Sequence, residues 1–529
     1  MKKIFIILAV AAFGFLSSCK KADFADSYPN PQRISSTNIE KQFAGFISSN
    51  SDYVIPNYWN YFVVLRTTID HYTQATGWQN TGGGQYVPGA ASIGAIWGSY
   101  YGFLTQYREF QNVYAKANAS DQTLMRIYMI AATIYLYDHT EKNVDLHGDI
   151  PFSEAGMISK NGGDYVNSFA AYDQAATVYT KMLDDLKAFA DELNSINVIA
   201  GVQVGFKNQD IVNHGDMGLW KKYCNSLRLR MLTRISGVSA LSARASSEIA
   251  SILGNSSSYP VPTTNADNVM IKVYDLNTGL NASGFRSGLE DWNGNIAGKV
   301  MIDHMKSNAD PRLRVLFEPG ANAVDGVYTG LDQLADAGVQ GTLLAGGTLA
   351  IYNRSTLSRN QWFPGVLMTA AEVQFYAAEY YLNAGNNAAA QTAYENGVKQ
   401  SVLFYYWLRS ISNDNTVSTP APTSDVEIGT YLAGSGINWT AAGTNVDKLK
   451  LIAAQKWLHL NVVEPYENWA ELRRLKLPAL TFVPDNTNPQ TLPPSRWIYP
   501  TEESTYNTAN YSKVAATDKN TTKIFWDVK

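Results

Sequence analysis

The stretch AAEVQFYAAEYYLNAGNNAAAQTAYENG, residues 370–397, predicts two helices joined by a turn at Gly385. Small and aromatic residues recur along it at helical spacing: Ala378, Tyr381, Ala390, Tyr394 and Gly397. Small residues let paired helices approach each other, and aromatic rings fill the groove between them. The stretch therefore predicts one helix pair of a repeat scaffold.

This spacing is that of tetratricopeptide helix pairs, and it occurs a second time earlier in the chain. Ala132 and Tyr135, then Ala175 and Tyr179, fit it if residues 140–168 form a long insertion between two helices. Two matches favour a repeat scaffold over a chance pattern.

Helical patterns dominate the rest of the chain, whereas strand-like runs are few and short, so the predicted fold class is mainly α. The predicted helices are 121–139, 169–192, 216–236, 240–253, 296–307, 367–384, 387–404 and 447–463. Ser168 and Asp216 are expected N-caps, and Ser120 or Asp121 is expected to cap the first helix. The loop-rich stretches are 72–92, 140–168, 255–295, 319–365, 405–446 and 478–529. A helical scaffold with long loops on one face is typical of a binding protein.

The N-terminus predicts export. Lys2 and Lys3 precede an apolar run of only 13 residues, 4–16, which is too short to span a membrane. The run ends in Leu-Ser-Ser-Cys, which resembles a bacterial lipobox. We therefore predict a signal peptide over 1–18, a lipidated Cys19 with a tether over 19–33, and a single α-helical binding domain over 34–529. The alternative is an ordinary cleaved signal in which Cys19 is incidental.

The amino-acid composition limits the classes of binding partner that we expect. The chain has 46 Asp and Glu against 42 Lys and Arg, so a nucleic-acid partner is not expected. Its two Cys cannot form an intramolecular disulfide once Cys19 is lipidated, and Cys224 lies in a helical pattern that favours a small buried residue over a nucleophile. Most of the 32 Tyr and 12 Trp are expected in the core, and in an exported protein any left on the surface hint at sugar binding, because flat rings stack on a pyranose.

Motifs of catalysis and metal binding are not found. No His pair has metal-ligand spacing, and no nucleophile elbow or phosphate loop occurs. His139 and His147 flank an acidic stretch, for which a solvated loop is a better interpretation than a metal site. Paired carboxylates of a glycoside hydrolase stay open, because such residues are often far apart in a chain. No cofactor is predicted; a structural Ca²⁺ is left open, although no dense Asp-x-Asp-x-Asp loop occurs.

Longer motifs are more specific, and they run in order through the chain. They are DLHGDIPFSEA (145–155), WKKYCNSLRLR (220–230), DPRL (310–313), TAAEVQFYAAE (369–379), QKW (455–457) with ENWAELRR (467–474), and RWIYP (496–500). Together with the lipobox, they resemble the signatures of the SusD/RagB-like nutrient-binding outer-membrane lipoproteins.

The resemblance implies a right-handed superhelix of about four tetratricopeptide-like helix pairs, with long loops that form a ligand-binding face. It also implies a non-catalytic lipoprotein on the outer face of the outer membrane, which binds glycan or oligosaccharide as the lid of a SusC-like TonB-dependent transporter. The motifs themselves are interpreted as scaffold. Glu372 and Glu379 are expected to be buried, with Arg228, Arg230, Arg473 and Arg474 as candidate partners.

Ligand-binding residues are chosen by chemistry, because the binding loops of such proteins vary. Aromatic rings beside polar hydrogen-bonding groups are the expected sugar platform. Three loop segments offer them, and the predicted residues are Trp78, Asn80 and Tyr86; Arg286, Asp291, Trp292 and Asn293; and Arg359 and Trp362. For each single aromatic, packing beneath its own loop is an equally good interpretation.

Other functions stay open at this point. An oligopeptide-binding lid would share the scaffold and the transporter. A tetratricopeptide-type adaptor would hold envelope proteins and would ignore glycans. A lipid-anchored glycan hydrolase would release product from a polysaccharide.

Overall fold

The computed structural model describes residues 37–273 and 279–529. The predicted signal peptide, Cys19 and the tether lie outside these residues. Within these residues, helices make up most of the fold, and the strands form only two short antiparallel pairs, β1–β4 and β2–β3. The prediction of a mainly α fold is thus confirmed, whereas the hand of a superhelix and the number of repeat pairs stay predictions.

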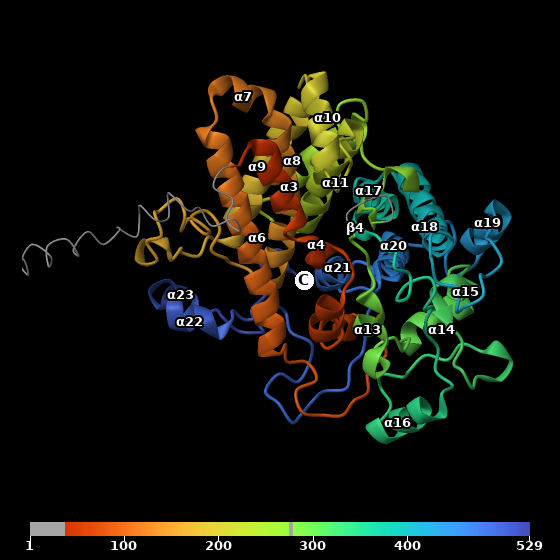
Figure 1. Ribbon diagram of the computed structural model, residues 1–529. Coiled ribbons are helices and arrows are strands. Elements are labelled where there is room, and N and C mark those ends of the chain that lie inside the picture. The colour runs from red at the N-terminus through yellow and green to blue at the C-terminus, as the bar shows by residue number, and fades with distance from the viewer. Residues whose placement is uncertain (1–36, 274–278) are drawn as a thin grey trace, which may run out of the picture.

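The first half of the described chain contains the longest helix, α6, and three further long helices, α8, α9 and α11 (Figure 1). Its elements are α3 (Ile39–Ser48), α4 (Ser51–Val54), the π-helix η1 (Trp59–Leu65), α5 (Ile69–Tyr72), α6 (Ala90–Lys116), α7 (Ala119–Leu124), α8 (Arg126–His147), η2 (Val166–Ser168), α9 (Ala175–Leu193), α10 (Ala200–Gln209), α11 (Met217–Ile235), α12 (Ser242–Gly254), η3 (Asn265–Asp267) and β1 (Val269–Ile271). Here α3 packs on α6 and α8, and α9 packs on α11.

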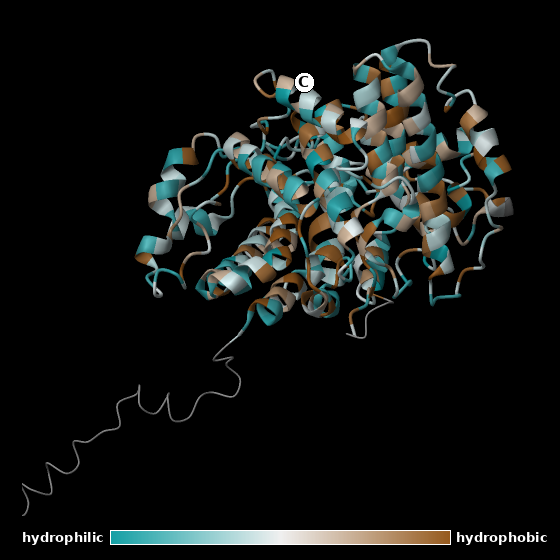
Figure 2. Cartoon of the chain, turned by 90° about the horizontal axis from the view of Figure 1, so that it is seen from above, coloured by the Kyte–Doolittle hydropathy of each residue, from teal (hydrophilic) through white to brown (hydrophobic). Residues whose placement is uncertain are grey.

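The second half alternates short elements with two longer helix pairs. Its elements are α13 (Phe285–Glu290), η5 (Asp291–Asn293), α14 (Lys299–Ser307), α15 (Leu313–Leu316), β2 (Phe317–Glu318), η6 (Val324–Gly326), α16 (Ala337–Gly346), β3 (Ile351–Tyr352), β4 (Gly365–Met368), α17 (Ala370–Asn383), α18 (Asn387–Ser410), α19 (Asp425–Ala433), α20 (Asn445–Leu460), α21 (Pro465–Leu475), α22 (Thr501–Tyr506) and α23 (Thr508–Val514). The long helices carry both hydrophobic and hydrophilic residues (Figure 2), as expected when one face packs on the core.

Residues 370–397 form the helix pair α17–α18, as predicted. Thr369 caps α17 by accepting a hydrogen bond from the Glu372 backbone N–H at 3.2 Å, and Gly385 takes a left-handed φ of 77° at the turn. A Cβ at Gly397 would lie 2.6 Å from the Phe375 ring, so only glycine lets the two helices approach this closely.

The second predicted pair, α8 with α9, is also present, but three of its boundaries are wrong. The predicted helix 121–139 is divided at Met125 into α7, which is capped by Asn118 rather than by Ser120 or Asp121, and α8, which continues to His147. Residues 140–147 are therefore helical, and the insertion is 148–174. The predicted cap Ser168 does not begin α9, which starts at Ala175, where the carboxylate of Asp149 accepts the backbone N–H at 2.8 Å. Asp216, by contrast, caps α11 as predicted.

The acidic stretch around His139 and His147 is not a solvated loop, which corrects that interpretation. Every residue of α8 from Ile127 to His147 is buried. Three carboxylates of the stretch, those of Asp138, Glu141 and Asp145, take part in a network of buried ion pairs. The charged composition looked like loop because the sequence does not show the partners that stabilise it.

The network joins five helices, α8, α11, α17, α20 and α21. Its other members are Lys142, Arg230, Arg234, Glu372, Glu379, Lys456, Glu464, Glu467, Glu471 and Arg474. The expected pairing of Glu372 and Glu379 is confirmed: Arg230 contacts Glu372 at 2.8 Å, and Arg474 contacts Glu379 at 2.7 Å.

The other two candidate partners of these glutamates were wrong. Arg228 pairs with Glu248 at 3.2 Å, and Arg473 donates to backbone carbonyls and stacks on the Trp469 ring. Cys224 is fully buried as predicted, and burial raises the pKa of its thiol to about 12, so it is not a nucleophile at neutral pH.

The longest helix, α6, was not predicted. Gly94, Gly98 and Gly102 interrupt its apolar pattern and lower its helix propensity. A Cβ at any of these three glycines would meet no neighbouring side chain or packed element within 4 Å, whereas other residues of α6 pack on α3 and α8. Tertiary packing of those residues therefore overrides propensity here.

We expect Gly98→Ala and Gly102→Ala each to raise the free energy of unfolding by about 0.5–1 kcal/mol, because alanine loses less backbone entropy in a helix and meets no neighbour. Denaturant midpoints measure the change. Gly397→Ala is the matched control and is expected to destabilise through its clash with Phe375. Destabilisation by the α6 variants would mean that this face is packed against something.

Two negative findings concern the described residues. Across 37–273 and 279–529, no helix combines the length and apolar character needed to cross a bilayer. Within the same ranges, no three His, Cys, Asp or Glu side chains gather so that they could hold a metal ion.

Candidate ligand-binding site

A cavity of about 430 Å³ lies where three loop segments meet. The first segment precedes α6, the second follows α13, and the third surrounds α16. The lining residues are Arg66, Gly77, Trp78, Gln79, Thr81, Trp292, Asn293, Gly294, Ile296, Leu331 and Leu344. Two of the three predicted segments thus come together, and each contributes a tryptophan.

The Trp78 ring is fixed from below by a stack of rings. It lies 5.1 Å from the His71 ring at an interplanar angle of 26°, and His71 lies 5.2 Å from the Tyr86 ring at 18°. Burial lowers the pKa of His71 to about 3, so its ring is neutral near pH 7. The stack holds Trp78 at the cavity in one orientation.

Tyr86 is a correction to the predicted site. It is 1 % exposed, and its hydroxyl donates to the Val483 carbonyl at 2.8 Å. It cannot touch a ligand in this structure and instead supports Trp78 through His71. The sequence could not separate these roles, because an aromatic residue in a loop has the same signature whether it stacks on a ligand or on a neighbour.

Trp292 faces the cavity from the opposite segment. Its side chain is 82 % exposed, and its backbone takes φ 56° and ψ 36°, while the following Asn293 has φ 59°. A left-handed backbone is costly for a bulky residue, and such strain persists mainly where function needs it. The conformation holds a large ring in solvent, where it is available for stacking.

Side-chain amides connect the segment before α6 to the segment around α16 through hydrogen bonds. Asn80 donates to the Gln333 carbonyl at 2.7 Å, and its backbone N–H donates to Gln340 at 2.6 Å. Gln79 donates to the Ala337 carbonyl at 3.1 Å. Asn80 was predicted as a ligand contact, but its amide hydrogens are used within the protein, so it positions the loop.

Gly77 allows the first and second segments to touch. Its N–H donates to the Ile296 carbonyl at 2.7 Å, and a Cβ there would lie 2.8 Å from the Leu331 Cβ. Ile296, Leu331 and Leu349 form a small hydrophobic cluster of their own beneath the cavity. The floor of the cavity is therefore a packed element rather than a loose loop.

Sequence reasoning missed an aromatic surface beside the cavity. Tyr58 stacks on Phe62 at 4.9 Å and 14°, and Phe62 meets the edge of Trp292 at 6.5 Å. Tyr58 is 41 % exposed and the neighbouring Trp59 is 53 % exposed. The four-residue spacing of Tyr58, Phe62 and Arg66 is the signal that could have revealed this face.

The remaining predicted residues lie outside the cavity lining. Arg286 and Asp291 are exposed. Arg359 forms a two-pronged ion pair with Glu290, with N–O distances of 2.9 and 2.8 Å, so its charge is already matched. Trp362 is 37 % exposed, and it follows Gln361, whose carbonyl accepts the Ala282 N–H. The predicted segment with Arg359 and Trp362 thus supports the predicted segment with Asp291 and Trp292, but it does not line the cavity.

Asp70 is buried beside this site, and neither of its carboxylate oxygens has a hydrogen-bond partner among the described residues. Desolvation raises its pKa to about 8. An unfolded Asp titrates near pH 4, so the folded state holds an extra proton between roughly pH 4 and 8. The stabilisation that Asp70 contributes is therefore complete below about pH 4 and is lost as the pH rises towards about 8.

We expect Asp70→Asn to remove this pH dependence of the unfolding free energy, since the amide does not titrate. Relative to the variant, the wild type should lose up to about 1.4 kcal/mol of unfolding free energy per pH unit between pH 5 and 8. Denaturant midpoints of both proteins across that range measure it. A constant difference between the two would show that Asp70 keeps an ordinary pKa.

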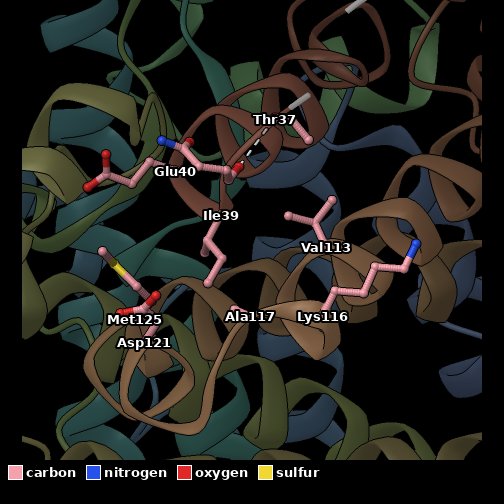
Figure 3. A pocket seen from close by; sticks show the side chains of 9 residues that line it. Thr37, Ile39, Glu40, Val113, Lys116, Ala117, Asp121 and Met125 are labelled. Atoms are coloured by element: carbon pink, nitrogen blue, oxygen red, sulfur yellow. Dashed lines mark hydrogen bonds between the residues drawn. The ribbon is translucent and has the colours of Figure 1, made fainter. Parts of the chain in front are cut away.

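A second cavity, of about 530 Å³, lies between the start of α3, the end of α6 and α7 (Figure 3). Figure 3 shows aliphatic side chains such as Ile39 and Val113 beside Lys116, Glu40 and Asp121. Although it is larger, none of the described residues that line it has an aromatic ring, so they offer no stacking platform for a sugar. The cavity with Trp78 and Trp292 is the stronger candidate.

Comparison with known proteins agrees with the fold and with the motifs. The family model described as "Starch-binding associating with outer membrane" matches residues 41–500. No curated protein sequence matches the chain.

Solved structures of similar fold cover nearly the whole chain. A chitin-binding SusD homolog from Flavobacterium johnsoniae is 22 % identical with a TM-score of 0.67, over 92 % of this chain and 99 % of that one. A chitin-binding protein is 20 % identical with a TM-score of 0.70, over 93 % and 99 %. A SusD homolog from Bacteroides thetaiotaomicron is 21 % identical with a TM-score of 0.66, over 93 % and 100 %. At these identities the likeness shows the shared fold.

Proposed function

This chain belongs to the SusD-like family, and from that premise we propose that it is a cell-surface lipoprotein that binds an oligosaccharide as the lid of a SusC-like TonB-dependent transporter. The family is one of glycan-binding proteins associated with the outer membrane, and its members bind rather than catalyse. The chain is therefore a binding protein, and what remains to be proposed is its ligand site, its anchor and its partner.

The observation that carries the binding proposal is the placement of two tryptophan rings on one cavity. Trp78 is held from below by neutral stacked rings, and Trp292 is held in solvent by a strained backbone. Flat rings stack on the apolar C–H face of a pyranose, and the polar groups of Gln79, Thr81 and Asn293 flank them for hydrogen bonding.

The anchor and the partner rest on the sequence. We propose residues 1–18 as the signal peptide, acyl chains on Cys19 as the membrane anchor, 19–33 as the tether and 34–529 as one binding domain. The tether and lipid would keep the domain at the outer surface, where a transporter could receive the ligand. The two chitin-binding relatives support a glycan over a peptide as the ligand.

Native affinity electrophoresis of residues 20–529 against a panel of polysaccharides tests the proposal. We expect at least one glycan to retard the protein. Peptide mixtures, followed by Trp fluorescence in parallel, separate the alternatives. A response to peptides alone would indicate an oligopeptide lid, and no response to either would overturn the binding proposal in favour of an adaptor.

A further inference from the structure

Arg66 lines the candidate cavity and is closely packed there. It directly follows η1 and is only 9 % exposed. Its guanidinium carbon lies 4.1 Å from the centre of the Phe62 ring, and a Cβ at Gly294 would lie 2.6 Å from its Cδ. The stem therefore packs closely against the Gly294 backbone, while the guanidinium packs on Phe62 and reaches the cavity wall.

The charge of Arg66 has no carboxylate partner among the residues that the structure describes. Nη1 donates to the Asp291 backbone carbonyl at 3.2 Å, and Nε is buried without a partner. Nη2 makes no hydrogen bond within the described chain and is not sealed from solvent. By contrast, the buried Arg230 and Arg474 each contact two or more carboxylates.

The desolvation of the Arg66 charge is therefore only partly offset by its neighbours. Desolvation lowers the pKa of Arg66 from its usual value, because burial disfavours the charged form. The carboxylate of Asp291 acts against this shift, but it lies beyond ion-pair distance and is exposed, where water and salt screen it. Arg66 is also the sole charged residue among those that line the cavity.

We propose that the cavity selects an acidic oligosaccharide, whose carboxylate or sulfate group is bound by the guanidinium of Arg66. A ligand anion would supply the missing partner, and the planar fork of arginine suits both groups. The two tryptophans would hold the sugar ring while Arg66 binds its charged group. This inference rests on the proposed glycan-binding function and adds the class of glycan.

The test uses polymer pairs that share a backbone and differ in the charged group. Polygalacturonate is compared with its methyl ester, and chondroitin with its carboxyl-esterified form, which report on carboxylates; chondroitin sulfate against chondroitin reports on sulfate. We expect affinity electrophoresis to show at least tenfold tighter binding of one charged member, weakening as NaCl is raised. Equal binding within every pair, or binding of neutral glycans alone, would overturn the inference and leave the glycan-binding function intact. No binding to any glycan would overturn the function itself.

Variants connect the effect to Arg66. Arg66→Gln is expected to lower affinity for the acidic polymer about 10- to 100-fold and to abolish its salt dependence. Arg66→Lys keeps the charge without the fork and is expected to retain part of the affinity, which also guards against a folding defect in Arg66→Gln. Arg244→Gln, a charge-matched change at a surface ion pair on α12, should bind like wild type. Unchanged binding by Arg66→Gln would overturn the assignment.

Discussion

Arg230→Met is expected to lower the free energy of unfolding by about 3–5 kcal/mol, because it removes the ion-pair partner of the buried Glu372 and Glu141, whereas Asp138 keeps Lys142 at 3.0 Å. Arg230 is fully buried and contacts Glu372 at 2.8 Å, Asp138 at 3.4 Å and Glu141 at 3.7 Å. Methionine preserves most of the apolar stem, so the loss reports on charge rather than on volume. Denaturant midpoints measure it.

The control is Arg126→Met, which removes a half-exposed pair with Glu192 of similar length, 2.8 Å. It is expected to cost less than about 1 kcal/mol, because water screens such pairs. The Arg230 defect should also shrink as the pH falls, since protonation neutralises the stranded carboxyls. Equal losses for the two variants at neutral pH would contradict the structural role of the network.

The second large effect is expected at the ligand site. Trp78→Ala and Trp292→Ala are each expected to weaken glycan binding about 30-fold or more, because each removes one ring of the platform, as at other aromatic hot spots. Isothermal titration with the glycan found by electrophoresis measures the change. The unfolding midpoint should stay close to wild type for Trp292→Ala, whose side chain is 82 % exposed.

Two aromatic variants sharpen this prediction. Trp362→Ala should bind like wild type, since Trp362 does not line the cavity. Tyr86→Phe should lose stability through the Val483 hydrogen bond but should leave the ring stack and most of the affinity in place. A strong binding defect in Trp362→Ala, with none in Trp292→Ala, would move the site away from the cavity.

Most of the scaffold could be predicted, because its signals are local. The helix pair around Gly385 follows from small and aromatic residues at fixed spacing, and Asp216 is recognisable as a cap. The end of α8 and the whole of α6 could not be predicted in this way. The charges of residues 140–147 argue locally against a buried segment, the glycines of α6 argue locally against a helix, and packing with distant helices overrides both.

The candidate site was predicted in part. The residue types of Trp78, Trp292 and Asn293 pointed to a sugar platform, and the structure brings these three to one cavity. Tyr86 and Asn80 belong to the same segments but support them, because their partners, Val483 and Gln333, are hundreds of residues away in the chain. Arg66 and the Tyr58–Phe62 surface were missed because they lie outside the long loops.

The central claim is that a glycan binds between Trp78 and Trp292, and a crystal structure of the protein with the retarding oligosaccharide tests it most directly. We predict density for a sugar ring stacked on at least one of these tryptophans inside the cavity. Well-ordered sugar elsewhere, for example in the cavity between α3, α6 and α7, with the tryptophan cavity empty, would contradict the account.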